Sequence, residues 1–469
     1  MLATRESKSE AENTIDSLVS IRTGEVNRRI FSDPEIFEQE MKLIFGRAWL
    51  FLCHETQIPN PGDFFESAMG RDNVLVVRQK DGSVKALLNS CAHRGNAVCR
   101  AEEGNVKGFL CTYHGWSFGI DGKLNGVPGY REFYGPDFDR SKAGLARVAQ
   151  LDTYKGFIFA TNDPTAPPLD DYLGATGKLS LDLVALRGDM EVVPGIQKFT
   201  INCNWKFAVD NLYDWYHPQV THISAFQTGA LGRPPTSNAG GPPRQDNEGA
   251  LDMRGVNMED GANLNIPVAG INGRTFDQIV VLGEYGHGIG GPEVTSSGTS
   301  QEANAWRERP EAQAGLGPVG IRVAGHPNVF PTTWVAFNAQ VSLRIPRTPD
   351  STEIWWFTFV DKGLPPEVRR QQVVMANRVF GPAGLLEQDD GENWAQATMQ
   401  TLGEASRQEP QRLIMGLGRG QVIKEHGLAY IETTTNEHAQ LWTYHSWAQW
   451  MKGLDWDELA AATEPPDVI

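Results

Sequence analysis

The sequence has few cysteines and lacks long apolar runs. Its 469 residues include five cysteines, an odd set in a large chain, which argues against a disulfide framework. No stretch approaches the roughly twenty apolar residues that a membrane-spanning helix needs. The polar start, residues 1–7, also lacks the apolar segment of a secretory signal. We therefore expect a soluble, cytoplasmic protein that does not associate with membranes.

The chain also has fewer basic than acidic residues. The chain has 42 lysines and arginines against 58 aspartates and glutamates, which gives a formal net charge of -16 at pH 7. Nucleic acids and anionic membrane surfaces select basic proteins, so we expect neither as a partner. Glycine-rich segments such as 286–290 lack the strand-to-helix setting of a dinucleotide fingerprint. Any reductant must therefore come from another protein.

Two cysteine–histidine pairs are the most informative pattern in the chain. Cys91-Ala-His93 is followed, after seventeen residues, by Cys111-Thr-Tyr-His114. Two thiolates on one iron and two imidazoles on the other are the ligands of a Rieske [2Fe–2S] cluster. Zinc accepts the same ligands, but zinc sites usually pair cysteine with cysteine and histidine with histidine. We therefore predict a Rieske cluster, and a protein that handles single electrons.

The length and the local patterns predict an α+β protein of two domains. Short β segments separated by turn residues indicate a small antiparallel β Rieske domain over 45–165, which ends in a proline-rich linker. A larger mixed catalytic domain, 166–469, should contain a central antiparallel sheet and helices, joined by an N-terminal helical segment, 1–44. Strands are expected at 333–337 and 354–360, and a helix at 366–380. The stretch 229–317, rich in Gly, Pro, Asn and Ser, is expected to form surface loops.

A second set of possible metal ligands lies in Asp214-Trp-Tyr-His217-Pro-Gln-Val-Thr-His222. In a regular helix, His217 and His222 would point about 140° apart. Pro218 removes a helical hydrogen bond, so we expect a kink or a one-residue bulge that turns both imidazoles to one side. One carboxylate would complete the facial triad of non-haem iron(II) oxygenases. The acidic run 387–392 is a source for it, although spacing alone does not choose among its acids.

Five blocks of the sequence match one family. They are Cys91-Ala-His-Arg-Gly95, Cys111-Thr-Tyr-His-Gly-Trp116, Asn204-Trp-Lys206, Asp214-Trp-Tyr-His217 through His222, and Phe380-Gly-Pro-Ala-Gly384 running into Asp389-Asp390. The chain thus resembles the large (alpha) subunit of the bacterial Rieske non-haem iron aromatic ring-hydroxylating dioxygenases, along nearly its whole length. The resemblance implies that His217, His222 and Asp390 hold a mononuclear iron(II). It also implies that Asp214 bridges His217 to the cluster ligand His114 of a neighbouring subunit.

The resemblance further implies a terminal oxygenase that takes electrons from a ferredoxin or an NADH-dependent reductase. Such an enzyme adds both atoms of O₂ to an aromatic ring and yields a cis-dihydrodiol. It would be an oligomer, either an α₃ trimer or an α₃β₃ assembly with small beta subunits. Two rival interpretations are a Rieske protein of electron transfer alone and a Rieske monooxygenase with the same metal ligands.

The substrate is less well defined by the sequence. The resemblance places substrate contacts near the iron, with Asn211, Leu212, Phe380 and Leu386 as candidates. The short spacing from Asn204 to His217 resembles enzymes that act on salicylate or related acids, whereas the remainder resembles hydrocarbon dioxygenases. We expect a phthalate- or benzoate-like carboxylate, with a neutral hydrocarbon such as biphenyl, naphthalene or a larger polycyclic compound as the alternative. A buried carboxylate needs a cationic or hydrogen-bonding partner, and the loop arginines are candidates, namely Arg233, Arg244, Arg254 and Arg274.

Overall fold

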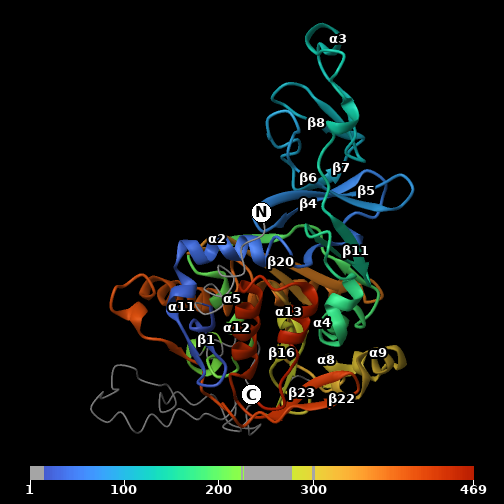
Figure 1. Cartoon of the computed structure of the whole chain (residues 1–469). Helices are drawn as coiled ribbons and strands as arrows, with labels where there is room; N and C mark the ends of the chain where they lie inside the picture. Colours follow the sequence, from blue (N-terminus) through green and yellow to red (C-terminus); the bar gives the residue numbers. More distant parts are fainter. Residues whose placement is uncertain (1–14, 223–224, 226–276, 298–300) are drawn as a thin grey trace.

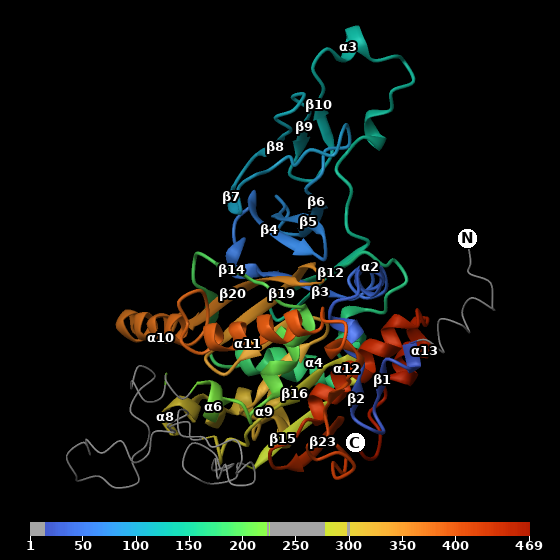
Figure 2. The same ribbon diagram turned by 90° about the vertical axis from the view of Figure 1, so that its left-hand side faces the viewer.

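The computed structural model describes residues 15–222, 225, 277–297 and 301–469, and it shows a broad body from which a narrower part projects (Figure 1). The body contains helices around a large antiparallel sheet, and the projecting part consists mainly of short strands (Figure 2). This architecture confirms the predicted α+β fold. Within the described ranges, no helix is long and apolar enough to cross a membrane.

The projecting part is built from two small antiparallel sheets with the strand orders β6-β5-β4-β7 and β10-β9-β8. Their strands are β4 (Asp63–Met69), β5 (Asp72–Arg78), β6 (Val84–Leu88), β7 (Glu103–Asn105), β8 (Gly108–Leu110), β9 (Ser117–Gly119) and β10 (Leu124–Gly126), and the short helix α3 (Tyr130–Phe133) lies at the tip. Alternate residues of β5 enter different cores, because successive side chains of a strand point to opposite faces. Leu75 and Val77 pack in the small core of the projecting part, whereas Val74 and Val76 pack in the main core.

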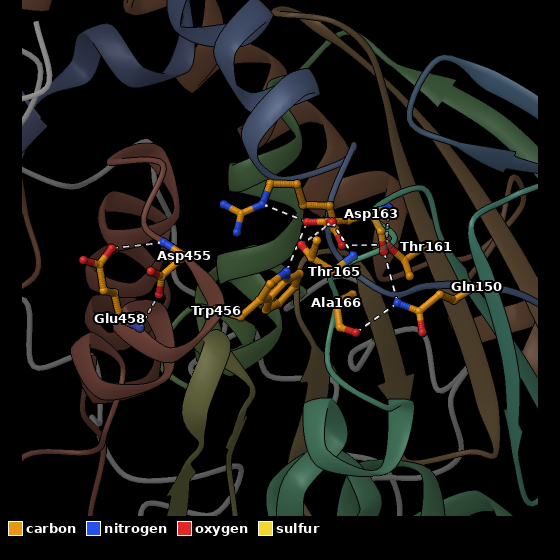
Figure 3. A network of polar contacts seen from close by, with 9 residues as sticks. Gln150, Thr161, Asp163, Thr165, Ala166, Asp455, Trp456 and Glu458 are labelled. Atoms are coloured by element: carbon orange, nitrogen blue, oxygen red, sulfur yellow. Dashed lines mark hydrogen bonds and ion pairs between the residues drawn. The ribbon is translucent and has the colours of Figure 1, made fainter. Parts of the chain in front are cut away.

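The junction between the two parts is a third antiparallel sheet and a polar network. The sheet contains β3 (Leu50–His54), β11 (Gln150–Tyr154) and β12 (Phe157–Thr161). Just after β12, the Asp163 carboxylate accepts hydrogen bonds from Arg47 (3.3 Å), from Thr165, and from the indole of Trp456 (3.1 Å) (Figure 3). Gln150 donates to the carbonyls of residues 163 and 166. The proline-rich segment 164–168 is therefore held by side chains from both sides of the junction.

The body is organised around an antiparallel sheet with the strand order β13-β20-β19-β18-β17-β16-β15-β23-β22, in which β14 also pairs with β20. Its strands are β13 (Met190–Val192), β14 (Gln197–Ile201), β15 (Gln278–Leu282), β16 (Gly288–Gly290), β17 (His326–Val329), β18 (Thr333–Ala336), β19 (Gln340–Thr348), β20 (Ser351–Asp361), β22 (Ile423–Glu425) and β23 (Leu428–Thr433). A small sheet of β1 (Val19–Ser20), β2 (Glu25–Val26) and β21 (Gln411–Arg412) lies apart from it. The strands predicted at 333–337 and 354–360 correspond to β18 and to most of β20.

Helices surround this sheet. They are α2 (Pro34–Leu43), α4 (Leu169–Ala185), α5 (Trp205–Asp210), α6 (Pro218–Thr221), α8 (Gln301–Asn304), α9 (Pro310–Gly320), α10 (Pro366–Val379), α11 (Glu387–Gln400), α12 (His438–Met451) and α13 (Trp456–Ala462). The helix predicted at 366–380 is α10. The prediction of loops over 229–317 is wrong for β15, for β16 and for the part of α9 that lies within that range. Frequent glycines hid β16 and α9, and residues 226–276 lie outside the described ranges.

The N-terminal helix α2 is tied to the body by one buried carboxylate. Glu40 accepts hydrogen bonds from the Lys206 ammonium (2.5 Å), from the Trp205 indole (2.9 Å) and from the Trp447 indole (2.8 Å). These donors come from α5 and α12, so a single side chain joins three helices. Because Glu40 and Lys206 are both buried, loss of either partner would leave an uncompensated charge in the core.

Candidate active site

The two cysteine–histidine loops of the projecting part have the same backbone design. The amide of Gly95 donates to the carbonyl of Cys91 (2.7 Å), and the amide of Gly115 donates to that of Cys111 (2.9 Å). The amide of each cysteine donates to the carbonyl five residues further on (2.9 and 2.8 Å). Both glycines have φ of +73°, a left-handed conformation that costs glycine little. Each loop is therefore one tight turn closed by a glycine.

These loops present an asymmetric set of donors. Cys91 and Cys111 are buried, free thiols that lie close enough to interact with each other. The rings of His93 and His114 are only partly buried, with centroids 4.4 Å apart, and His93 stacks on Trp116. Two sulfurs inside and two imidazoles nearer the surface match the ligand set of a Rieske cluster. The strands that flank the second loop, β8 and β9, lie in the projecting part, away from α11 in the body (Figures 1 and 2).

A second set of donors lies in the body. His217 Nε2 and His222 Nε2 are 3.2 Å apart, and each lies 3.2–3.3 Å from Asp390 Oδ1. A metal with bonds of about 2.1 Å to nitrogen and oxygen holds adjacent ligands about 3.0–3.4 Å apart. Among the described residues, this is the group of His, Cys, Asp and Glu side chains that meets the spacing of a metal site. Two histidines and one carboxylate form the facial triad of non-haem iron sites.

The backbone around Pro218 differs from our prediction. The prediction of a kink or bulge inside a continuous helix is wrong. The chain leaves the helical conformation at Asp214 (φ -82°, ψ 105°), and α6 begins at Pro218. A proline at the first helical position loses no hydrogen bond, since that amide has no partner within the helix. His217 and His222 are the residues that flank this single turn. Their rings therefore meet without any distortion of a longer helix.

A carboxylate faces the Nδ1 nitrogen of each candidate ligand, His217 and His222. Asp214 Oδ2 lies 3.4 Å from His217 Nδ1, and Asp389 Oδ2 lies 3.6 Å from His222 Nδ1. The other oxygen of Asp214 accepts hydrogen bonds from the amides of residues 216 and 217 (2.7 and 3.2 Å). Such outer carboxylates fix the tautomer and the orientation of a metal-bound imidazole.

The electrostatics of the site favour a cation. Burial acts to lower the pKa of His217, but the carboxylates of Asp214 and Asp390 outweigh burial and raise this pKa to about 10. Burial acts to raise the pKa of Asp214, yet His217 and the two amides hold it below the usual value. The two acids therefore remain ionised beside the imidazoles. A bound metal would take the place of the proton, because the histidine ligands must be neutral.

The first turn of α11 is anchored by a second buried acid, Glu387, one turn before Asp390. Its Oε1 lies 3.0 Å from Arg344 Nη2 of β19, and both side chains are fully buried. Glu387 also accepts hydrogen bonds from the Trp356 indole (2.5 Å) and from the amide of Gly381 (3.0 Å). These bonds fix the start of the helix and hence the position of the Asp390 carboxylate.

Five aromatic side chains gather between the two segments that carry the metal ligands. We call Trp215, His326, Trp334, Phe337 and Phe380 the aromatic wall. The ring centroid of His326 lies 5.0 Å from that of Trp215, 5.3 Å from Trp334, 5.4 Å from Phe337 and 6.3 Å from Phe380. Phe380 also stacks on Trp356, with centroids 4.8 Å apart.

The four predicted pocket residues lie on these same two segments. Asn211 and Leu212 are in the turn before Asp214, and Phe380 and Leu386 precede Asp390. Leu212 and Phe380 are buried, whereas Asn211 and Leu386 are partly buried. The sequence analysis missed His326, Trp334 and Phe337, because strands β17 and β18 bring them to the site from a distance along the chain. A histidine and an asparagine around Pro327, just before an apolar strand, were the available signal.

The loop arginines proposed as partners of a carboxylate, namely Arg233, Arg244, Arg254 and Arg274, lie outside the described residues. The buried arginine beside the aromatic wall is Arg344, whose guanidinium lies 4.2 Å from the Trp334 ring. Its charge is already paired with Glu387.

Comparisons with known proteins agree with this geometry. The Rieske [2Fe–2S] domain model matches residues 48–152, and the model of the ring hydroxylating alpha subunit (catalytic domain) matches residues 178–452. Biphenyl 2,3-dioxygenase subunit alpha of Rhodococcus jostii is 35% identical over 96% of this chain and 94% of its own. Biphenyl dioxygenase subunit alpha of Paraburkholderia xenovorans is 34% identical over 95% of both chains. A solved naphthalene 1,2-dioxygenase mutant bound to phenanthrene has a TM-score of 0.79 at 30% identity, covering 97% of both chains.

The fold and the two donor sets define a Rieske non-haem iron oxygenase. The chain belongs to the family of ring-hydroxylating dioxygenase alpha subunits. This confirms the resemblance drawn from the five sequence blocks, together with the predicted cofactors, a Rieske [2Fe–2S] cluster and a mononuclear iron. The match to the catalytic domain rules out a protein of electron transfer alone.

Proposed function

We propose that this terminal oxygenase subunit adds both atoms of O₂ to a neutral aromatic hydrocarbon and yields a cis-dihydrodiol. The observation that carries the proposal is the aromatic wall, which lies between the segments that bear His217 and Asp390. Apolar rings suit a neutral ring through burial of apolar surface, whereas a carboxylate would need a free cation. The names of the relatives also refer to hydrocarbons and a chlorinated ring: biphenyl, benzene, naphthalene and chlorobenzene.

Our expectation of a phthalate- or benzoate-like acid therefore loses its support. It rested on the short spacing before His217 and on the loop arginines. The relatives favour the alternative, a neutral hydrocarbon. Arg344, the buried arginine beside the aromatic wall, is engaged by Glu387.

In the proposed site, His217, His222 and Asp390 would hold the mononuclear iron, and Cys91, His93, Cys111 and His114 would hold the cluster. When bound, the iron would supply the activation of O₂ beside the substrate. Asp214 and Asp389 keep the two imidazoles oriented through their outer nitrogens. The aromatic wall holds the ring and excludes water from it.

We further propose that Asp214 connects the two donor sets across a subunit boundary. The strands β8 and β9, which flank the second cluster loop, and α6 lie in different parts of the molecule (Figure 2). Asp214 is a carboxylate with capacity for a further hydrogen bond, and His114 of a second copy of the chain is the proposed donor. The complete enzyme would then be a trimer of this chain, with or without small beta subunits, that receives electrons from a ferredoxin or an NADH-dependent reductase.

Product analysis tests the proposed function. The purified protein, loaded with both metals and supplied with a compatible electron donor, should convert naphthalene or biphenyl to a cis-dihydrodiol. Isotopically labelled O₂ should place two labelled atoms in each product molecule. Incorporation of a single atom would instead indicate a monooxygenase. Turnover of phthalate or benzoate with no turnover of either hydrocarbon would contradict the proposed substrate class.

A further inference from the structure

The histidine at the centre of the aromatic wall has a ring nitrogen that can accept a hydrogen bond, which no other side chain of the wall has. His326 opens β17 and is 7% exposed. Its ring stacks on Phe337 with an interplanar angle of 9° and meets the edges or faces of Trp215, Trp334 and Phe380. Trp215 directly follows Asp214, and Phe380 lies just before α11. His326 is thus a polar group placed among apolar rings beside the proposed iron ligands.

The two ring nitrogens of His326 are in different situations. The carbonyl of Leu212 acts as the hydrogen-bond acceptor for this imidazole. Nε2 is buried and has no hydrogen-bond partner within the described part of the chain. A neutral imidazole has one N–H donor and one acceptor nitrogen. Because Nε2 has no partner, the Leu212 carbonyl accepts from the N–H on Nδ1, and Nε2 carries the lone pair.

The charge state of His326 supports the same assignment. Burial lowers its pKa to about 3, and the Leu212 carbonyl offsets only part of this effect. The imidazole is therefore neutral at physiological pH. A buried acceptor without a donor is unfavourable, which is why such groups usually have a partner.

Trp334 adds a second unpartnered polar atom to the aromatic wall. Its side chain is 4% exposed, and its Nε1, an N–H donor, has no partner among the described residues. One acceptor on His326 and one donor on Trp334 complement a hydroxyl group, which can donate and accept at once. A carboxylate has no hydrogen to donate to Nε2, and its charge would be buried without a free cation.

We propose that His326 is a specificity-determining residue whose Nε2 accepts a hydrogen bond from a hydroxyl on the aromatic substrate. The site then takes neutral hydroxylated arenes in preference to the unsubstituted ring, and it disfavours aromatic carboxylates. This inference rests on the proposed function, and it narrows the substrate class of the same site.

Binding in the absence of turnover tests this inference. Equilibrium dialysis of the metal-loaded protein, without O₂ and without an electron donor, gives dissociation constants for 2-naphthol, naphthalene and 2-naphthoate. The ratio of the naphthalene constant to the 2-naphthol constant measures the contribution of the hydroxyl. His326→Leu removes the acceptor and should lower this ratio by about tenfold, the effect of one hydrogen bond. His326→Gln keeps an acceptor and should retain most of the preference.

Phe337→Leu is the matched control, because it removes an aromatic ring that stacks on His326 and keeps the acceptor nitrogen. It should weaken the binding of 2-naphthol and naphthalene together, so its ratio should fall less than that of His326→Leu. Iron content and cluster absorption identify variants that have lost the site, and His326→Phe, which keeps a flat ring, serves if His326→Leu loses iron. An unchanged ratio in a metal-loaded variant without the acceptor would overturn the inference, as would tighter binding of 2-naphthoate than of 2-naphthol by the wild type. Formation of a naphthalene dihydrodiol tests the proposed function separately, since it does not require Nε2.

Discussion

The carboxylates of Asp214 and Asp389 lie in similar positions beside His217 and His222, but we propose different roles for them. Each faces the Nδ1 atom of one histidine of the proposed iron site, at 3.4 and 3.6 Å. Both can therefore orient an imidazole. Only Asp214 is proposed to reach a second subunit as well. The pair offers a way to separate orientation of a ligand from connection of the two metal sites.

Asp214→Ala should leave the cluster in place but severely slow its oxidation by O₂ in the presence of substrate. The substitution deletes the proposed hydrogen-bonded path and frees the orientation of His217. Loss of an outer carboxylate can also weaken metal binding by roughly 10- to 100-fold. Iron content must therefore be measured beside the rate, by stopped-flow absorption of the cluster.

Asp389→Ala is the control for this prediction. It should weaken iron binding at His222 while leaving cluster oxidation near the wild-type rate in fully loaded protein. Rapid cluster oxidation in fully loaded Asp214→Ala protein would show that Asp214 is not the connector.

Glu387 anchors the first turn of α11, the helix that carries Asp390. Glu387→Gln leaves the Arg344 guanidinium buried without a charged partner, a change that typically costs about 3–5 kcal/mol. We expect a lower unfolding midpoint in denaturant and loss of the mononuclear iron, with normal cluster absorption. The double variant Arg344→Met with Glu387→Leu removes both charges and should recover a large part of the lost stability. A stable, fully iron-loaded Glu387→Gln protein would mean that the ion pair does not position α11.

The two cluster loops have the same backbone hydrogen bonds, but the neighbours of their glycines differ. A Cβ atom on Gly115 would lie 3.0 Å from Pro128 Cγ, whereas a Cβ atom on Gly95 would have Ser90 Oγ as its nearest neighbour, at 3.8 Å. Both replacements force a side chain into a left-handed conformation, at a cost of about 1–2 kcal/mol.

We therefore expect Gly115→Ala to lower the temperature at which the cluster absorption is lost by more than Gly95→Ala does. Thermal bleaching of the visible spectrum measures both variants under the same conditions. Equal losses would show that backbone strain alone, without the contact to Pro128, sets the stability of the loops.

Most predictions about individual loops, helices and strands came from local sequence patterns. The candidate ligands of each cluster loop lie within four residues of one another, so a local motif is enough to predict Cys91, His93, Cys111 and His114 as a cluster site. The prediction around Pro218 failed because a proline fits the first turn of a helix as readily as it disrupts the interior, and the surrounding residues decide which applies. β15 was missed because five buried residues are too few to show a period.

The contacts that could not be predicted from the sequence join residues that lie far apart in the chain. Asp390 lies far along the chain from His217, and it was singled out from its acidic neighbours by the family resemblance alone. The pairing of Arg344 with Glu387 joins β19 to α11. The ring contacts of His326 join β17 to β18 and to the segments around Trp215 and Phe380. No spacing rule connects such residues, so the aromatic wall and the anchor of α11 emerged only from the structure.

At the scale of the whole molecule, the chain keeps its two donor sets in separate parts. The cysteine–histidine loops belong to the small core of the projecting part, and the His217–His222–Asp390 set belongs to the body (Figure 1). The two parts share the junction around Asp163 and Trp456. Loss of one metal site should therefore leave the other intact, because no ligand is common to both.

Iron analysis of His217→Ala beside the wild type tests most directly whether the two metal sites have separate ligands. The wild-type protein should contain about three iron atoms per chain, two in the cluster and one mononuclear. The variant should contain about two, with an unchanged Rieske absorption spectrum and no oxygenation of any arene. A folded variant that keeps all its iron, or that loses the cluster and the mononuclear iron together, would contradict the account.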